Sequence, residues 1–431
     1  MGTLRFFDYT WGIMKITILT SGSRGDTQPY IALGLALKQA GHSVQVAAFE
    51  NYESFVRSFG LDYFKVRGDV AAVASGESGK NAAKVDNPLK LLLSFNKLKD
   101  HLFDVQVDFY NACKNADVVV YHPGAAVGYF AAQQFNIPSV LATPFPMSPT
   151  RDYSSLIFYD MPRLGKGYNL ITHKILEEIF WFASTSPLKT FLKKELGQLP
   201  RGFSNPFSKQ ITKRNPTIMS SSEHVFHTPS DRRPNVHTTG YWFLDDVGDW
   251  APPAELNEFL QNGSKPVYIG FGSMGSFGSG EQTTALVIEA LKISGQRGVL
   301  ASGWDGMSKS TKLPENIFML ESAPHSWLFP RMAAVVHHGG AGTTAEGLRA
   351  GVPSIIIPHA NDQYAWGRRV HELGVGPKAI RRKHLTAENL AETIRVALTD
   401  DIKYKADDLG KKIRAERGAE NAAKVILDST R

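Results

Sequence analysis

Cysteine is almost absent from this 431-residue chain, in which Cys113 stands alone. A single thiol cannot form an internal disulfide or a thiolate cage for a metal ion, so the sequence predicts a reducing compartment, the cytoplasm. The amino terminus, MGTLRFFDYTWGI, also lacks the basic stretch followed by an apolar stretch that marks a secretory signal.

Long apolar runs are missing as well. Residues 118–150 contain no Asp, Glu, Lys or Arg, but they include His122 and five prolines. These residues break any helix long enough to cross about 30 Å of hydrocarbon. We expect a buried strand, a helix and a second buried strand there instead of a membrane span.

Biased composition is absent too. Hydrophobic residues make up 42% of the chain and charged residues 21%, which excludes collagen-like, coiled-coil and disordered proteins. The net charge of +7, from 48 Lys and Arg against 41 Asp and Glu, favours anionic partners. Phosphorylated ligands or acidic membrane surfaces fit this balance, and nucleic acid is not expected; an ordinary basic surface is the alternative.

Short apolar runs alternate with segments of helical period, which is typical of parallel sheets covered by helices on both faces. Residues 244–256, LDDVGDWAPPAEL, collect turn formers and a Pro-Pro pair, a composition typical of a linker. We therefore expect an α/β protein with one domain at residues 14–243 and a second at 257–431, whose last helices can pack back on the first. Such an arrangement places a ligand cleft between the carboxyl ends of two sheets.

Residues 151–200 mix aromatic and basic side chains, as in KILEEIFWFASTSPLKTFLKK. The pattern predicts amphipathic helices. Core packing, an apolar substrate pocket or a surface that contacts an anionic membrane would each account for it.

The strongest local motif is AAVVHHGGAGTTAEGLRAG at residues 333–351. A buried strand leads into a glycine-rich loop, and Thr343 and Thr344 follow at the start of a helix. Glycines let backbone N–H groups approach a phosphate, hydroxyls add donors, and the helix terminus carries partial positive charge. The motif predicts a diphosphate site; an empty glycine-rich turn is the alternative.

Two further loops are expected at the cleft. Asp362 and Gln363 follow the apolar strand PSIIIP, and their adjacent carboxylate and carboxamide suit the hydroxyls of a sugar. In the other half, LTSGSRGDTQP places Asp26 between the first strand and the first helix. Asp26 could remove a proton from an acceptor hydroxyl or cap the helix, and the two roles are compatible.

Other motifs are weaker. GFGSMG at residues 270–275 fits G-x-G-x-x-G and permits an alternative function, an NAD(P)-dependent oxidoreductase. No two aspartates are separated by one residue, so the simplest acidic motif for a metal on a nucleotide diphosphate is missing. We therefore expect no metal and no cofactor, and a leaving diphosphate would be stabilised by backbone dipoles, hydroxyls, His338 and Arg24.

Together, GSRGDTQPYIALGLALKQAGH, GFGSM, SGW, SAPHSWLFP, HHGGAGTTAEGLRAGVP and NDQ resemble, in order and spacing, the family 1 glycosyltransferases that use nucleotide sugars. The likeness is greatest to their sterol 3-beta-glucosyltransferase branch and to related bacterial natural-product enzymes. It implies the GT-B fold, two Rossmann-like domains that face each other across a cleft. It also implies an inverting, metal-independent transfer of a hexose, glucose from UDP-glucose in the first place, to a hydroxyl of a sterol, a lipid or a polyketide or flavonoid aglycone.

The resemblance also implies a role for each site residue. Asp26 would be the general base, in a place where plant-type relatives carry histidine, and His122 is a candidate helper because a carboxylate is the weaker base. The donor, a UDP-sugar that acts as co-substrate, would be bound by Ser23, Arg24, Gly25, Ser273, Trp304, Ser322, Ala323, His325, His338, Gly340, Ala341, Gly342, Thr343, Thr344, Glu346, Asp362 and Gln363.

Within this set, the resemblance assigns Ser322, Ala323 and His325 to the uracil, Glu346 to the ribose hydroxyls, and Asp362 with Gln363 to the sugar. A nucleotide-sugar-binding protein without turnover is a further alternative. A peripheral, salt-sensitive contact with anionic membrane is a separate expectation.

Overall fold

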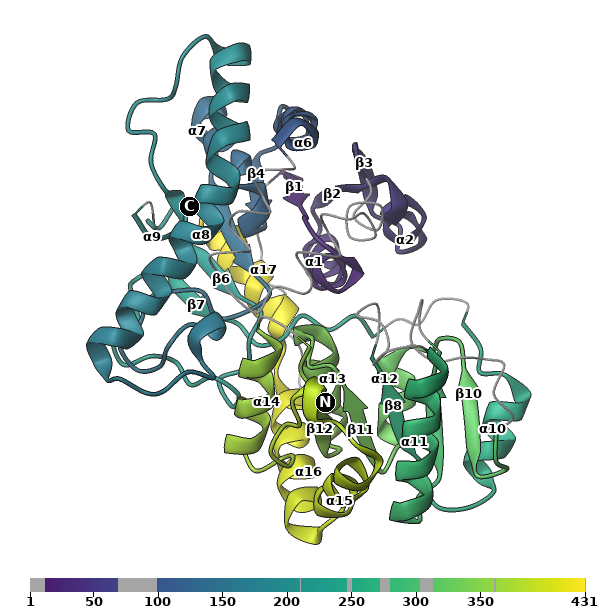
Figure 1. Cartoon of the computed structure of the whole chain (residues 1–431). Coiled ribbons are helices and arrows are strands. Elements are labelled where there is room, and N and C mark those ends of the chain that lie inside the picture. Colours follow the sequence, from purple (N-terminus) through teal and green to yellow (C-terminus); the bar gives the residue numbers. More distant parts are fainter. Residues whose placement is uncertain are drawn as a thin grey trace, which may run out of the picture.

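The computed structural model describes residues 12–68, 99–209, 211–245, 250–271, 280–302, 313–359 and 362–430. Within these ranges the strands form two parallel sheets, which lie in separate halves of the molecule (Figure 1). We call the half with the larger sheet the first lobe and the half with the smaller sheet the second lobe. The predicted α/β class is confirmed.

In the described part of the first lobe, seven strands are ordered β3-β2-β1-β4-β5-β6-β7. Ile16 of the central strand pairs with Val44 on one side and Val118 on the other, and none of the three is more than 4% exposed. The strands are β1 (Lys15–Leu19), β2 (Ser43–Phe49), β3 (Asp62–Val66), β4 (Val118–Tyr121), β5 (Ser139–Thr143), β6 (Thr217–Met219) and β7 (Val236–Thr238). They follow the apolar runs of the sequence, because strands buried on both faces need continuous apolar side chains.

The helices of the first lobe are α1 (Arg24–Gln39), α2 (Glu53–Ser58), α6 (Lys99–Ala112), α7 (Val127–Phe135), α8 (Lys166–Leu196) and α9 (Pro206–Lys209). Short 3₁₀ turns are η1 (Glu50–Tyr52), η3 (Pro123–Ala125) and η4 (Leu156–Phe158).

The sheet of the second lobe is ordered β10-β9-β8-β11-β12 over the residues that the structure describes. Its strands are β8 (Val267–Gly270), β9 (Gly298–Ala301), β10 (Ile317–Leu320), β11 (Ala334–His337) and β12 (Ser354–Ile356). Its helices and turns are α10 (Ala254–Gln261), α11 (Gly280–Ser294), α12 (His325–Leu328), η6 (Phe329–Arg331), α13 (Ala341–Ala350), α14 (Gln363–Glu372), η7 (Arg382–His384), α15 (Ala387–Ala397) and α16 (Asp400–Ala415).

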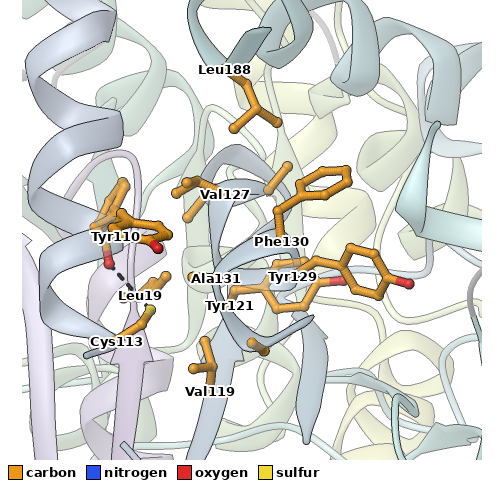
Figure 2. Packing of buried hydrophobic residues seen from close by; sticks show 14 of the residues in the cluster. Leu19, Tyr110, Cys113, Val119, Tyr121, Val127, Tyr129, Phe130, Ala131 and Leu188 are labelled. Atoms are coloured by element: carbon orange, nitrogen blue, oxygen red, sulfur yellow. Dashed lines mark hydrogen bonds between the residues drawn. The ribbon is translucent and has the colours of Figure 1, made fainter. Parts of the chain in front are cut away.

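The core of the first lobe lies between the sheet and the helices α6, α7 and α8. Figure 2 shows Val127 and Phe130 of α7 beside strand residues such as Val119, with Leu188 of α8 above them. Cys113 is fully buried in this cluster, and its Sγ donates to the carbonyl of Phe109 at 3.2 Å. The lone thiol is therefore an apolar core residue, and burial raises its pKa.

The region predicted as several amphipathic helices contains one long helix, α8, which continues through Pro187. Proline has no N–H to bond to the carbonyl four residues earlier, which usually ends a helix. Here Pro187, Leu188 and Phe191 are buried, so packing maintains the helix across the missing hydrogen bond. In the described part of the chain, no helix has the length and apolar composition needed to cross a bilayer.

The last helix, α17 (Gly418–Asp428), leaves the second lobe and packs against α1 of the first. Figure 1 shows it in yellow, reaching upward from the green and yellow second lobe. The predicted linker at residues 244–256 lies between β7 and β8, although α10 already begins within it at Ala254. The domain boundaries at residues 243 and 257 stay a prediction.

Candidate active site

The loop between β1 and α1 folds the predicted base back onto the start of its own helix. Asp26 Oδ2 accepts two hydrogen bonds from Ser23, one from the backbone N–H at 2.7 Å and one from the hydroxyl at 2.8 Å. Gly22 has a φ of +120°, and a Cβ at this position would collide with the Asp26 carboxylate. The capping role is therefore present, and it occupies one carboxylate oxygen, Oδ2.

Arg24 and Gly25 form the exposed first turn of α1. The Arg24 guanidinium lies over the ring of Phe55, 4.5 Å from its centroid. A cation at this turn lies at the carboxyl end of β1, the edge where parallel sheets bind ligands.

His122 ends β4, at the same edge of the sheet. Its Nδ1 accepts a hydrogen bond from the Gly124 N–H at 3.0 Å, so the neutral ring carries its proton on Nε2. Burial lowers the pKa of His122 to about 4, and the charge of Asp26 acts in the opposite direction. The imidazole is therefore neutral near pH 7, although the negative charge of Asp26 favours its protonated form.

The glycine-rich corner of the second lobe joins β11 to α13. Gly339 has a φ of +91°, its N–H donates to His337 Nδ1 at 3.1 Å, and a Cβ on it would lie 2.7 Å from Ile356. A Cβ on Gly340 would lie 2.6 Å from His338 Nε2. Glycine is thus required at both positions for the loop to fold tightly beneath the imidazole of His338.

Gly340 is also the N-cap of α13, so no side chain of the cap accepts from the first N–H groups of the helix. Amides of the first turn, at Ala341, Gly342 and Thr343, are left for an anion, and the helix dipole adds partial positive charge. Thr344 is fully buried, and its hydroxyl donates to the Gly340 carbonyl at 2.9 Å. Thr343, which is half-buried, is therefore the hydroxyl available to a ligand.

His338 contributes a hydrogen bond and no charge. Burial lowers the pKa of His338 to about 4, so the ring is neutral at physiological pH. Its Nδ1 has no hydrogen-bond partner among the described residues. The expected imidazole contact to a diphosphate is therefore a neutral one, and the positive field comes from the α13 terminus and Arg24.

Three residues that the sequence assigns to the uracil of the donor follow β10. Ser322 is exposed, Ala323 is half-buried, and His325 begins α12, where its ring stacks on Phe329 at 4.3 Å between centroids. Burial lowers the pKa of His325 to about 4, and the charge of Arg24 acts in the same direction. Arg24 belongs to the first lobe, so its charge acts across the boundary between the lobes.

Glu346, the predicted ribose ligand, lies on α13 and is 8% exposed. Arg349 Nη2 donates to its Oε2 at 2.9 Å, and the Arg349 guanidinium also pairs with Asp245, near the start of the predicted linker. Burial raises the pKa of Glu346, and the Arg349 charge opposes that shift. Arg349 therefore binds one oxygen of the Glu346 carboxylate and favours its ionised form.

Asp362 and Gln363 stand at the start of α14, as their position after β12 predicts. Trp366 Nε1 donates to Asp362 Oδ2 at 3.1 Å, and the His359 N–H donates to Gln363 Oε1 at 2.8 Å. Burial and the charge of Asp26 raise the pKa of Asp362 to about 6, and the hydrogen bond from Trp366 acts in the opposite direction. The Asp26 carboxylate of the first lobe is therefore close enough to act on the ionisation of Asp362.

These contacts bring the predicted residues of both lobes to one place. Helix α1 lies within a Cα–Cα distance of 8 Å of α13. Asp26 acts electrostatically on Asp362, and Arg24 on His325. Ser273 and Trp304 lie outside the described residues. Over the part of the chain that is described, no group of three or more His, Cys, Asp or Glu residues could hold a metal ion.

Comparison with known proteins agrees with this geometry. Residues 16–154 match the glycosyltransferase family 28 N-terminal domain, and residues 299–428 match the C-terminal domain of proteins like erythromycin biosynthesis protein CIII. A sterol 3-beta-glucosyltransferase of Arabidopsis thaliana is 33% identical over 413 residues, which are 94% of this chain and 66% of the relative. The chain is similar to glycosyltransferases over both lobes. The predicted family resemblance is thereby confirmed.

Other relatives extend the comparison. A sterol 3-beta-glucosyltransferase of Emericella nidulans is 36% identical over 425 residues, 96% of this chain and 30% of that protein. The chain thus spans just under two thirds of the Arabidopsis relative and under one third of the fungal one.

Solved structures show the same fold. The kitacinnamycin glycosyltransferase superposes with a TM-score of 0.70 at 18% identity, over 97% of this chain and all of its own. SnogD of Streptomyces nogalater gives 0.67 at 20% identity, over 96% and 99%. The glycosyltransferase SsfS6 of Streptomyces sp. SF2575, in complex with thymidine diphosphate, gives 0.61 at 19% identity, over 96% and 99%. The predicted GT-B fold is confirmed.

Several residues around this site were missed by sequence reasoning. Arg349 and Trp366 each bind the carboxylate of a predicted ligand residue on the same helix, and their spacings of three and four residues are the only sequence signal for them. The contact of Glu372 with Tyr159 and Arg163 of the first lobe has no such signal, because these two partners are more than 200 residues away in the chain.

Proposed function

We propose that this protein is an inverting glycosyltransferase that moves a hexose, glucose from UDP-glucose in the first place, to a hydroxyl of an apolar acceptor. A sterol, a lipid or a polyketide or flavonoid aglycone fits this class. One observation carries the proposal: Asp26 of the first lobe and the start of α13 belong to elements that contact each other, and Asp362 lies in electrostatic reach of Asp26.

The proposed reaction follows from this placement. The acceptor hydroxyl loses its proton to Asp26 Oδ1, and its oxygen forms a bond to the anomeric carbon of the donor. The bond from that carbon to the diphosphate oxygen breaks, and UDP leaves with the electron pair. Attack from the face opposite the leaving group inverts the configuration, so no covalent enzyme intermediate is needed.

The second lobe would stabilise the leaving group. The N–H groups at the start of α13, the Thr343 hydroxyl and the neutral ring of His338 supply hydrogen bonds to the diphosphate. Asp362 and Gln363 would bind sugar hydroxyls, and Glu346 the ribose. Binding both substrates in one cleft supplies proximity, which is a large part of the rate in transfers of this kind.

A substrate screen tests the proposal. The purified protein is incubated with UDP- and dTDP-sugars against sterols, diacylglycerol and phenolic aglycones, and both nucleotide release and the glycosylated product are measured. We expect product with at least one UDP-hexose and one apolar alcohol, with inverted anomeric configuration. Retained configuration, or absorbance changes with NAD(P)H in place of nucleotide release, would contradict the proposal.

We also propose that the protein works in the cytoplasm at the surface of an anionic membrane, which it contacts through helix α8. Ile171, Ile175 and Phe182 are 55%, 40% and 54% exposed, and their spacing of four and seven residues places them on one face of the helix. We call these three residues the apolar face of α8. Exposed Lys189 and Lys193 follow toward the end of the helix.

The charge around this face suits anionic lipid. Glu178 lies within the face, but its carboxylate accepts a hydrogen bond from Asn205 Nδ2 at 2.9 Å. Leu164, 68% exposed, extends the apolar surface before the helix begins. Apolar side chains that enter the interface, flanked by lysines that bind anionic headgroups, give reversible and salt-sensitive attachment.

Vesicle flotation tests this surface. We expect the protein to float with vesicles that contain phosphatidylserine at about 50 mM NaCl and to be released at about 500 mM NaCl. The triple variant Ile171→Ser, Ile175→Ser, Phe182→Ser should bind at least about tenfold less. A variant with Val396→Ser and Tyr404→Ser, which removes exposed apolar side chains elsewhere, is the control. Equal flotation of both variants would exclude α8 as the contact.

A further inference from the structure

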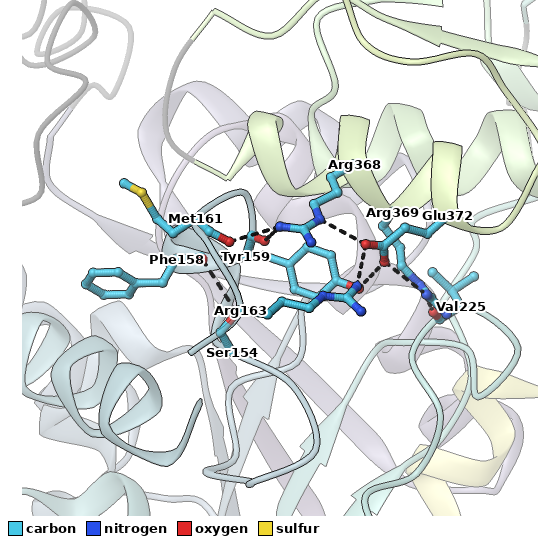
Figure 3. A network of polar contacts seen from close by, with 9 residues as sticks. All are labelled: Ser154, Phe158, Tyr159, Met161, Arg163, Val225, Arg368, Arg369 and Glu372. Carbon is cyan, nitrogen blue, oxygen red and sulfur yellow. Dashed lines mark hydrogen bonds and ion pairs between the residues drawn. The ribbon is translucent and has the colours of Figure 1, made fainter. Parts of the chain in front are cut away.

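Helix α14 carries the predicted sugar ligands at its start and is bound by the first lobe at its other end. Figure 3 shows Glu372 at the centre of this contact, where it accepts from the Tyr159 hydroxyl at 2.7 Å and pairs with Arg163. Arg368 pairs with Glu372 and donates to the carbonyls of Tyr159 and Met161, each at 2.9 Å. The end of α14 is thus fixed to residues of the first lobe.

A second contact lies one turn closer to the start of α14. The Trp366 side chain is 1% exposed, and its ring meets the edge of Phe226 of the first lobe at 5.6 Å between centroids. Phe226 is 3% exposed, and Arg369 lies over it while donating to the carbonyl of Val225 at 2.5 Å. The indole of Trp366 is therefore packed against a buried side chain of the first lobe.

The indole also holds the Asp362 carboxylate by a hydrogen bond. Trp366 Nε1 donates to Asp362 Oδ2 at 3.1 Å, and the Trp366 backbone N–H donates to the Asp362 carbonyl, also at 3.1 Å. With Oδ2 bound to the indole, Oδ1 is the oxygen directed to a ligand. A carboxylate that is already held by hydrogen bonds loses less rotational freedom when it binds a sugar hydroxyl.

We propose that Trp366 is a positioning residue, which orients Asp362 toward the donor sugar and does so because Phe226 of the first lobe fixes its ring. The inference rests on the proposed function, since it assigns Asp362 to the sugar. It goes beyond that function by making sugar recognition in the second lobe depend on a side chain of the first lobe.

The test compares two ligands that differ only by the sugar. Trp366→Phe keeps a buried aromatic ring and removes the N–H. Calorimetric affinities are measured for UDP-glucose and for UDP. We expect the variant to lose at least about fivefold in affinity for UDP-glucose, while its affinity for UDP stays within about twofold of the wild type. Because the indole bond favours the ionised carboxylate, the acidic limb of UDP-glucose binding should also move to higher pH.

Two more variants complete the test. Trp242→Phe removes a comparable buried indole bond, to Thr239 Oγ1 at 2.8 Å, and should leave the ratio of the two affinities unchanged. Phe226→Leu keeps an apolar side chain, removes the ring edge and should weaken UDP-glucose binding in the same selective way.

Equal losses for UDP and UDP-glucose in Trp366→Phe, or no loss at all, would overturn the positioning role. A wild-type protein that binds neither ligand would instead overturn the proposed function, and this inference with it.

Discussion

The Asp26 carboxylate has two functions in this account, one for each oxygen. Oδ2 accepts both Ser23 hydrogen bonds and fixes the start of α1, which leaves Oδ1 for an acceptor hydroxyl. A base held in this way needs no further residue to orient it. The buried, neutral His122 adds a polar group beside it without adding a competing charge.

Another buried carboxylate, Asp362, should lower the stability of the folded protein when it is ionised. Its pKa rises from an ordinary value of 3.8 to about 6, because burial disfavours the ionised form. Between these pH values the folded protein binds more protons than the unfolded chain, so stability falls as the pH rises. Asp362→Asn should therefore raise the melting temperature by roughly 1–3 °C at about pH 8, and by almost nothing at about pH 4.

Thermal unfolding followed by circular dichroism at both pH values measures this difference. The same shift in melting temperature at both pH values would show that the Asp362 charge does not oppose folding.

At the scale of elements, the junction of β11 and α13 is the part that the sequence predicted most fully. Glycines, threonines and histidines converge on it because a strand end, a tight turn and a helix start follow one another within a few residues. Local order of this kind can be inferred from a pattern of residue types. The contact of His338 with Gly340 adds the reason why glycine is needed there.

Gly340→Ala tests this junction. A Cβ would lie 2.6 Å from His338 Nε2, so the ring of His338 or the loop would have to shift. We expect the affinity for UDP to fall at least about tenfold, because the first amides of α13 lose their alignment. Gly167→Ala, at a helical glycine with nothing within 4 Å of the added methyl, is the control for calorimetry. Unchanged UDP affinity in Gly340→Ala would show that the loop between β11 and α13 does not bind UDP.

Helix α8 shows the limit of sequence reasoning about elements. The mixture of aromatic and basic residues favoured several amphipathic helices, yet burial of Leu188 and Phe191 keeps a single helix intact through Pro187. The partners of Trp366 and Glu372 were missed for a similar reason. They are set by packing between residues far apart in the chain, on which a periodic pattern carries no information.

At the scale of the whole molecule, the chain passes between the lobes twice. It crosses once between β7 and β8, and again when α17 returns to the first lobe. The second crossing is closely packed, since a Cβ on Gly418 would collide with the Tyr241 carbonyl, and Ser222 donates to Glu416 at 2.7 Å. Both lobes are thus joined at two places beside the cleft, which limits how they can move apart.

Ile426→Ala tests the contribution of the second crossing. Ile426 is fully buried among the α1 and α17 side chains, so truncation should destabilise the protein by about 2–5 kcal/mol. Urea unfolding measures the loss, with Leu427→Ala, at a half-buried neighbour, expected to cost less. Equal and small effects from both would show that α17 adds little to the first lobe.

The most direct measurement of the central claim compares turnover and donor binding in Asp26→Asn. The amide still accepts from Ser23 but cannot take a proton, so we expect kcat to fall at least about a hundredfold while UDP affinity stays within about twofold. Asp117→Asn, which keeps an acceptor for the Lys15 N–H far from the cleft, should retain full turnover. Full turnover in Asp26→Asn, or loss of UDP binding with turnover retained, would contradict the account.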